Sequence, residues 1–205
     1  MTGRTRQILI TNDDGVRASG LQALAERASV LGEVTVIAPD REQSGAAHAL
    51  TIRQPLRVDR VAERWFAVEG TPTDCVNLAF FHLLDRPPDL VLSGINAGYN
   101  LGDDITYSGT VAGAMEGRIL GAPGVAVSAD PQATPSQLDL AAMHGVRVAS
   151  LLMERGLPDG SFLNVNVPPS PRGMRLTHQG RREGRDLLAG RDPKGRDYFW
   201  GGLVQ

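Results

Sequence analysis

Two neighbouring carboxylates follow the first apolar run of the chain. Asp13 and Asp14 come after the run 7–11 and stand directly before Gly15. Neighbouring residues of a continuing strand point to opposite faces, so the two carboxylates converge only if the strand ends there, and Gly15 permits such a turn. Converged carboxylates repel each other unless a cation neutralises them, and Mg²⁺ and Mn²⁺ favour hard oxygen ligands. The same residues also suit a simpler polar turn, in which Asn12 and its neighbours bond to their own backbone.

Two later loops carry further small polar groups. Ser44 and Gly45 follow a strand-like run at 33–38, and Asn96 follows a second run at 89–93. In open α/β sheets, ligands bind beyond the carboxyl ends of the strands, so we expect both loops to meet the acidic pair. Two carboxylates, a hydroxyl and an amide, completed by waters, form an octahedral oxygen shell that leaves room for a phosphate. As alternatives, Ser44 is an ordinary loop hydroxyl and Asn96 an ordinary turn residue.

A third group of polar residues opens a helix. The run Tyr107-Ser108-Gly109-Thr110 precedes a helical pattern at 111–120. Free backbone N–H groups at a helix start, with Ser and Thr hydroxyls beside them, favour an anion such as phosphate. An ordinary Ser or Thr helix cap explains the same residues if they are taken alone.

Short apolar runs alternate with helical patterns along the first 169 residues. This alternation predicts a Rossmann-like α/β sandwich of three layers with a mainly parallel sheet. Hairpin-like pieces near 56–58 and 65–68 interrupt it. Ser19 and Thr71 are expected to cap their helices, because Gln or Asp follows three residues later. The expected strands are 7–11, 33–38, 89–93, 124–128 and 162–167, and the expected helices open at Ser19, Thr71, Val111 and Leu138.

Composition bounds the class of protein. The chain has 205 residues, of which 41% are hydrophobic and 21% charged, which suits one globular domain with a full core. A net charge of -2 gives no basic face for long nucleic acid. No apolar run reaches the roughly 18 residues that span a bilayer, and we expect no membrane partner. The N-terminus lacks the features of a signal peptide and the single Cys75 fits a reducing compartment, so a cytoplasmic protein is expected.

The C-terminal part differs from the rest in charge. From Ser170 onward, eight basic residues stand against four acidic ones, among several Gly and Pro. This composition predicts an exposed arm or β-hairpin, so we divide the chain into a catalytic domain, 1–169, and an arm, 170–205. Three consecutive aromatic residues lie at 198–200. Aromatic residues and Arg are enriched at protein interfaces, so the arm is expected to serve oligomerisation, unless it folds back on its own domain.

In their order along the chain, these pieces resemble the SurE (survival protein E) family of 5'/3'-nucleotidases. The resemblance runs from residue 8 to about residue 202, and as a set its motifs are highly specific. They are Ile10-Thr11-Asn12-Asp13-Asp14-Gly15, Ala38-Pro39-Asp40-Arg41-Glu42-Gln43-Ser44-Gly45, Gly70-Thr71-Pro72-Thr73-Asp74-Cys75-Val76, Leu90-Val91-Leu92-Ser93-Gly94-Ile95-Asn96-Ala97-Gly98-Tyr99-Asn100-Leu101-Gly102 and Tyr107-Ser108-Gly109-Thr110-Val111-Ala112-Gly113-Ala114-Met115-Glu116-Gly117.

The resemblance implies an activity and a set of site residues. It implies a metal-dependent phosphomonoesterase that hydrolyses nucleoside 5'- and 3'-monophosphates to nucleoside and phosphate, with short polyphosphate as a further substrate. It also implies one divalent metal ion, Mg²⁺ or Mn²⁺, per subunit, and a homodimer or homotetramer assembled through C-terminal extensions. The implied metal ligands are Asp13, Asp14, Ser44 and Asn96, of which Asp13 and Asp14 are also catalytic, and the implied substrate-binding residues are Gly45, Asn96, Ser108, Gly109 and Thr110.

Some features depart from the family pattern. Tyr107 stands where the family often has His, so we assign it no catalytic role, and the family usually continues beyond the position of Gln205. His48 is the histidine nearest to the predicted site, whereas His82 and Cys75 suit structural roles. Two other functions stay open. A haloacid-dehalogenase-type phosphatase requires two acids separated by one residue, whereas these are adjacent. The other is a non-enzymatic nucleotide-binding or regulatory module.

Overall fold

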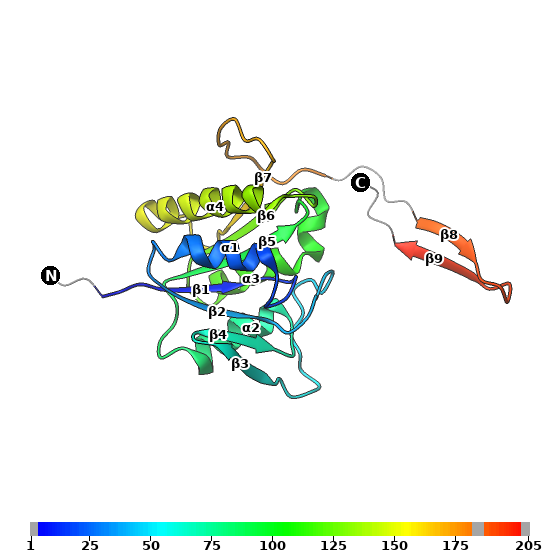
Figure 1. The fold of residues 1–205 in the computed structure, drawn as a ribbon, viewed down its shortest axis with the longest axis horizontal. Helices are drawn as coiled ribbons and strands as arrows, with labels where there is room; N and C mark the ends of the chain where they lie inside the picture. The colour runs from blue at the N-terminus through cyan, green and yellow to red at the C-terminus, as the bar shows by residue number, and fades with distance from the viewer. Residues whose placement is uncertain (1–3, 182–186, 202–205) are drawn as a thin grey trace.

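A seven-stranded sheet forms the centre of the molecule (Figure 1). The structure, a computed structural model, describes residues 4–181 and 187–201. The strand order is β3-β4-β2-β1-β5-β6-β7, and all neighbours run parallel except β3 and β4. The strands are β1 (Gln7–Thr11), β2 (Glu33–Pro39), β3 (Val58–Ala62), β4 (Trp65–Val68), β5 (Leu90–Ala97), β6 (Gly124–Ala129) and β7 (Leu163–Val167).

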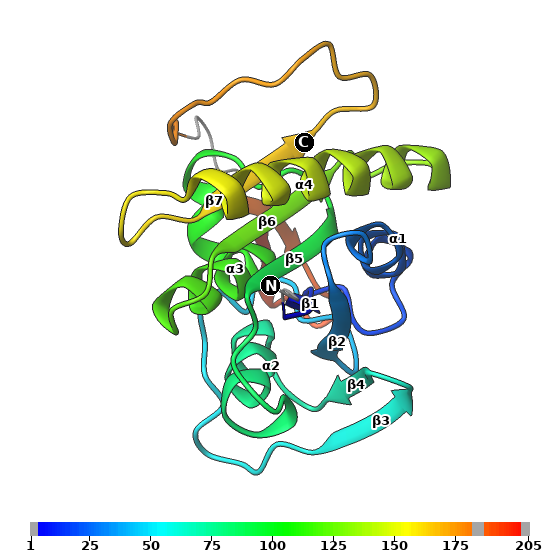
Figure 2. The same ribbon diagram turned by 90° about the vertical axis from the view of Figure 1, so that its left-hand side faces the viewer.

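Helices cover both faces of this sheet. Figure 2 shows α1 and α4 on one side and α2 and α3 on the other, which confirms the predicted three-layer α/β sandwich. The helices are α1 (Ser19–Ala28), α2 (Pro72–Leu78), α3 (Gly109–Ile119) and α4 (Pro135–Arg155), with a π-helical turn η1 (Ala79–Leu83) and a 3-10 helix η2 (Gly102–Tyr107). No helix in the described residues is long and apolar enough to cross a membrane.

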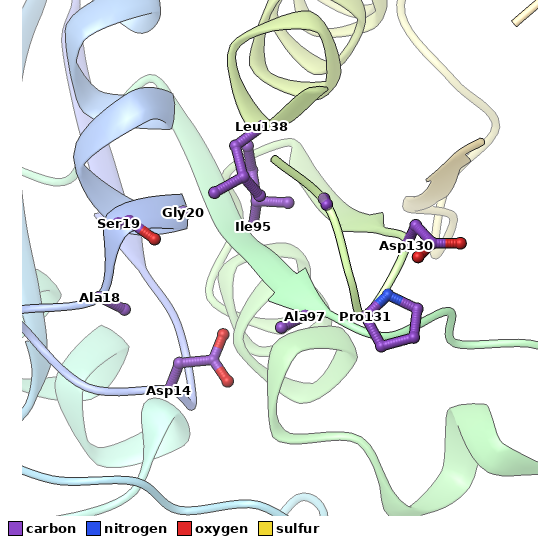
Figure 3. Close-up of a pocket in the computed structure, with 10 residues that line it drawn as sticks. Asp14, Ala18, Ser19, Gly20, Ile95, Ala97, Asp130, Pro131 and Leu138 are labelled. Atoms are coloured by element: carbon purple, nitrogen blue, oxygen red, sulfur yellow. The ribbon is translucent and has the colours of Figure 1, made fainter. Parts of the chain in front are cut away.

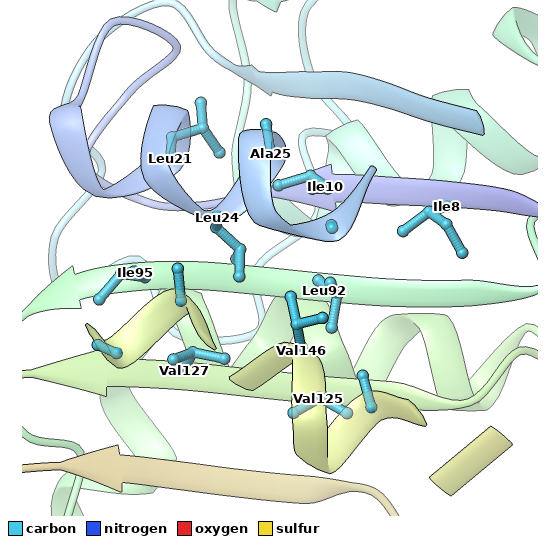
Figure 4. Packing of buried hydrophobic residues seen from close by; sticks show 14 of the residues in the cluster. Ile8, Ile10, Leu21, Leu24, Ala25, Leu92, Ile95, Val125, Val127 and Val146 are labelled. Carbon is cyan, nitrogen blue, oxygen red and sulfur yellow. The ribbon is translucent and has the colours of Figure 1, made fainter. Parts of the chain in front are cut away.

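The apolar runs of the central strands are explained by burial on both faces. In β1, Ile8 and Ile10 pack with Leu24 of α1 and Val146 of α4, as Figure 4 shows. Leu9 lies between them in sequence and packs on the other face, in the cluster that contains residues of α2. A strand covered on both sides has no polar face, so its sequence reads as one apolar run rather than an alternation.

The helix starts agree with the sequence in part. Thr71 caps α2 as expected, and Asp74 completes the capping box. The expected cap at Ser19 is wrong, because the N-cap of α1 is Ala18 and no side chain bonds there. Helix α4 begins at Pro135, earlier than the expected Leu138, because Thr134 and Gln137 form a capping box ahead of it. These changes move helix ends by one turn or less and leave the layers unchanged.

A two-stranded antiparallel sheet near the C-terminus confirms the expected hairpin. It consists of β8 (Leu187–Arg191) and β9 (Asp197–Gly201), which form a sheet of their own, separate from the main sheet within the described residues (Figure 1). The hairpin-like piece expected near 65–68 is β4, whereas the piece expected near 56–58 shares only Val58 with β3, which runs on to Ala62; both strands extend the main sheet at one edge. The division into a catalytic domain, 1–169, and an arm, 170–205, stays a prediction.

Candidate active site

The carboxyl ends of β1, β2 and β5 meet at one edge of the sheet. Strand β1 lies between the other two, and in register Thr11 is paired with Ser93 of β5. From β1 the chain crosses through α1 to β2 on one side, while β5 lies on the other side. Such a reversal of strand order opens a crevice where ligands bind. The loop that begins at Asn12 emerges into it.

Asn12 shapes the turn that follows β1. Its side-chain Nδ2 donates to the backbone oxygen of Gly15 at 3.2 Å, and its Oδ1 accepts from the Gly15 N–H at 3.2 Å. Gly15 has a φ of 102°, in the region that favours glycine. The simple polar turn is therefore present, and Asn12 makes it. The side chains of Asp13 and Asp14 take no part in these turn hydrogen bonds.

Asp13 is buried against the start of α3. Asp13 is only 4% exposed, and its Oδ1 accepts a hydrogen bond from the Thr110 hydroxyl. Burial raises the pKa of Asp13, and the Thr110 hydroxyl and the backbone N–H groups of Gly109 and Thr110 counteract that rise. A Cβ on Gly109 would lie 3.0 Å from the Asp13 Oδ2, so a side chain there would crowd the carboxylate. Helix α3 thus presents its N-terminus to this acid, where a helix favours negative charge.

Asp14 is half-buried and faces a cleft of about 340 Å³. Burial and then the neighbouring charge of Asp13 raise the pKa of Asp14 to about 6, while the backbone N–H of Ala97 counteracts the rise. Figure 3 shows its carboxylate turned toward Ala97, whereas the carboxylate of Asp130, on the far side, points away. The cleft is lined by Asp14, Ala18, Ser19, Gly20, Ile95, Ala97, Asp130, Pro131, Ala133 and Leu138.

The loop after β2 reaches the same place. The N–H of Gln43 donates to the backbone oxygen of Asp13 at 2.7 Å, which brings Ser44 and Gly45 to the edge of the site. Ser44 is exposed, and its hydroxyl donates to Glu42 Oε1 at 2.7 Å. The charge of Glu42 also raises the pKa of Asp14. Sequence reasoning missed Glu42, although an acid two residues before Ser44 was a visible signal.

Asn96 lies at the end of β5, next to Ala97. Its Nδ2 donates to the backbone oxygen of Gly98 at 2.7 Å, so the side-chain oxygen is the atom that a cation would meet. Ser108 is the N-cap of α3, and its hydroxyl accepts from the Val111 N–H at 3.1 Å. The expected helix cap is therefore present, and it stands beside the residues that bond to Asp13.

The donor set fits a hard divalent cation. After burial, the charge of Asp13 is the next cause that raises the pKa of Asp14, and a cation relieves this repulsion. Residues 4–181 and 187–201 contain no group of three His, Cys, Asp or Glu side chains that could hold a metal. A site here would instead combine two acids with a hydroxyl and an amide, and such oxygen-only sets suit Mg²⁺ or Mn²⁺.

Residues with no expected chemical role lie outside this group. Tyr107 is 50% exposed, and its backbone oxygen accepts a hydrogen bond from the Ala47 N–H. His82 is exposed on η1. Cys75 is fully buried in the α2 face of the core, and burial raises the pKa of its thiol well above the ordinary value. A thiol in that position behaves as a small apolar group.

Comparisons with known proteins agree with the motifs. A family model described as survival protein SurE matches residues 8–186. The 5'-nucleotidase SurE of Geotalea daltonii is 53% identical over 203 residues, which cover 97% of this chain and 82% of that protein. The 5'-nucleotidase SurE of Geobacter sulfurreducens is 51% identical over 198 residues, or 94% of this chain and 76% of that one.

A solved structure agrees as well. The crystal structure of the SurE protein from Aquifex aeolicus superposes with a TM-score of 0.85 at 42% identity, and covers 95% of this chain and 81% of that one. The fold, the motifs and the relatives that match over nearly all of this chain therefore agree. The chain belongs to the SurE family.

Proposed function

We propose that this protein is a metal-dependent phosphomonoesterase that hydrolyses nucleoside 5'- and 3'-monophosphates to nucleoside and phosphate, and accepts short polyphosphate as well. The observation that carries the proposal is the junction of Asp13 with the N-terminus of α3. It puts groups that bind a cation and groups that bind an anion at one point, as hydrolysis of a phosphate ester requires. The name 5'-nucleotidase given to the relatives supports the substrate class.

One divalent ion per subunit, Mg²⁺ or Mn²⁺, would be held by Asp13, Asp14, Ser44 and Asn96. When bound, such an ion polarises phosphoryl oxygens and lowers the pKa of a coordinated water. Asp14 accepts the proton of the attacking water, because its carboxylate is half-buried and faces the cleft. Burial raises the pKa of Asp13, and its hydrogen bonds to the start of α3 counteract that rise.

The phosphate group is bound by Ser108, Gly109 and Thr110, with Gly45 and Asn96 at its edge. Hydroxyl and N–H groups at a helix start favour the negative charge that develops on the phosphoryl oxygens. The water oxygen forms a bond to phosphorus as the bond from phosphorus to the nucleoside 5' or 3' oxygen breaks, and the leaving oxygen takes up a proton from solvent. The residues thereby fix the phosphate and the attacking water relative to each other, which is the main work in phosphoryl transfer.

The test compares turnover with binding. Asp13→Asn and Asp14→Asn should each lower phosphate release from nucleoside monophosphates by orders of magnitude, while the fold survives because the carboxylates no longer repel each other. Nucleotide affinity should fall instead with changes at the phosphate-binding residues near Ser108. Near-parent turnover in both Asn variants would place the site elsewhere. Binding without turnover in the parent protein, whatever the metal, would instead indicate a nucleotide-binding module.

We also propose that the protein is cytoplasmic and forms a homodimer or homotetramer through the arm 170–205. Tyr198 and Phe199 of β9 are 46% and 65% exposed, and two adjacent exposed aromatic residues favour a protein partner over water. The side chain of the third aromatic residue, Trp200, lies outside the described part of the structure. The predicted reducing compartment rests on the single cysteine.

A further inference from the structure

A long segment with no helix or strand crosses the proposed site between β2 and β3. Residues 43–51 of it, here called the strap, carry Ser44 and Gly45. The strap gains little from apolar burial, because Leu50 is 53% exposed and Ile52, just beyond it, is 83% exposed. A segment that buries so little apolar surface must be held by other contacts, or it samples many conformations.

One buried carboxylate holds the strap from α3. Glu116 is 6% exposed, and its Oε2 lies 2.7 Å from His48 Nε2. Its Oε1 accepts from Asn77 Nδ2 at 2.6 Å, and the same nitrogen of Asn77 donates to the backbone oxygen of Thr73 at 3.0 Å. Each carboxylate oxygen of Glu116 therefore has a hydrogen-bond partner, and the partner of Oε2 is His48 of the strap.

A second buried carboxylate holds the strap from α2. Asp74 is 2% exposed, and it accepts from the Thr51 N–H at 2.9 Å and from the Thr51 hydroxyl at 2.6 Å. The hydroxyl of Thr71, which caps the same helix, donates to the backbone oxygen of Ala49 at 2.7 Å. The strap is thus bound at both His48 and Thr51 to acids that lie beneath it.

The proposed site lies at the other end of the strap. The Gln43 N–H is bound to Asp13, and the Ala47 N–H is bound to the backbone oxygen of Tyr107 at 3.2 Å. Ser44 lies between these two contacts, and three residues separate it from His48. A buried carboxylate is costly to leave without partners, so Glu116 and Asp74 favour the one strap position that supplies them.

We propose that Glu116 and Asp74 are positioning residues, which act through His48 and Thr51 to hold the strap and so set Ser44 beside the acidic pair. This inference rests on the proposed function, because it takes Ser44 as a metal ligand. Some residues hydrogen-bond to a metal ligand or its segment without touching the metal. Loss of such a residue typically lowers metal affinity by about tenfold or more. The strap contacts therefore contribute to metal affinity although none of them touches the metal.

The test measures Mn²⁺ affinity of the full chain directly, by calorimetry or by the electron paramagnetic resonance of free Mn²⁺. His48→Ala should weaken Mn²⁺ binding about tenfold. Thr51→Val, which keeps the side-chain shape and removes the hydroxyl, should weaken it in the same direction and serves if His48→Ala does not fold. His82→Ala removes an exposed histidine on η1 and should leave Mn²⁺ affinity unchanged.

A double-mutant cycle separates positioning from a general loss of stability. In a Ser44→Ala background, His48→Ala should cause no further loss of Mn²⁺ affinity, because the ligand it positions is already gone. Amide hydrogen exchange across 43–51 should become faster in His48→Ala. If Ser44→Ala weakens Mn²⁺ binding but His48→Ala and Thr51→Val do not, the positioning role is wrong. If Ser44→Ala itself binds Mn²⁺ like the parent, the ligand assignment in the proposed function fails instead, and the positioning role with it.

Discussion

The hydroxyl of Thr110 donates to the carboxylate of Asp13, and this contact joins two motifs that stand 97 residues apart in the chain. It favours the ionised form of a carboxylate whose pKa is raised by burial. It also fixes the start of α3 against the end of β1. The cation-binding and anion-binding halves of the proposed site are therefore one unit.

Removal of this hydroxyl should damage stability and activity together. Thr110→Val keeps the shape and the backbone N–H but leaves Asp13 with fewer donors. We expect a loss of about 1–3 kcal/mol in the free energy of unfolding, because a buried charged group loses a partner. Thr110→Ser keeps the hydroxyl and should stay closer to the parent. Chemical denaturation and phosphate release, measured side by side, check both variants, and equal behaviour of Val and Ser would contradict the role of the bond.

An added methyl group at Gly109 should disturb the same junction. Gly109→Ala places a Cβ within 3.0 Å of Asp13, against an acid that has little freedom to move. A displacement of about 1 Å at a reacting group commonly costs about 100-fold in rate, and we expect a loss of that order in kcat. Gly173→Ala is the control, because a Cβ there meets no atom within 4 Å. Similar kcat values for the two variants would show that the close approach does not matter.

The metal-free protein should lose stability as pH rises through the titration of Asp14. The folded state holds its pKa at about 6, above the ordinary 3.8, so the folded protein binds the proton more tightly than the unfolded chain. The stabilisation from protonated Asp14 is thus complete below about pH 4 and lost as pH rises through about 6. Thermal unfolding in EDTA should show this fall in the parent and a smaller fall in Asp14→Asn.

A second variant tests the cause of that shift. In Asp13→Asn the neighbouring charge is gone, so the pKa of Asp14 should move down and the fall in stability should occur at lower pH. Burial is the larger cause of the raised pKa and still acts in this variant, so the pKa of Asp14 should stay above its ordinary value. An unchanged pH profile in Asp13→Asn would mean that the two carboxylates do not interact in the folded protein.

Much of the fold followed from sequence because local and global signals agree. The run around Ile8 and Leu9 is apolar at every position, and the structure buries it on both faces. The capping box at Thr71 could be predicted from the sequence because its two residues, Thr71 and Asp74, are three positions apart. Helix α4 begins three residues before the predicted Leu138, because its capping box at Thr134 precedes the apolar positions from which the prediction is made.

The site was predictable as a set of loops, but its contacts were not. The order of strands puts the ends of β1, β2 and β5 together, so the meeting of Asp13 and Asn96 with the loop of Ser44 could be expected. The bond from Thr110 to Asp13 and the bond from His48 to Glu116 depend on packing between distant segments. No local spacing encodes such pairs, which is why the sequence alone assigned no role to Glu116.

Removal of the arm 170–205 should change the oligomeric state of the protein and leave the catalytic residues in place. A chain that ends at Pro169 lacks the arm and keeps Asp13, Asp14 and α3, so we expect a smaller oligomer with activity that depends on the arm only indirectly. Light scattering of both chains at micromolar concentration measures the masses. A monomeric mass for the intact chain would end the proposal that the arm joins subunits.

Dependence on a divalent ion tests the central claim most directly. The measurement is phosphate release from a nucleoside monophosphate by protein verified to be free of metal, followed by titration with Mn²⁺ or Mg²⁺. Because Asp13 and Asp14 repel each other without a cation and the phosphate lacks a partner of opposite charge, we predict no turnover before the titration and saturating recovery during it. Full turnover in the verified metal-free protein would contradict the account.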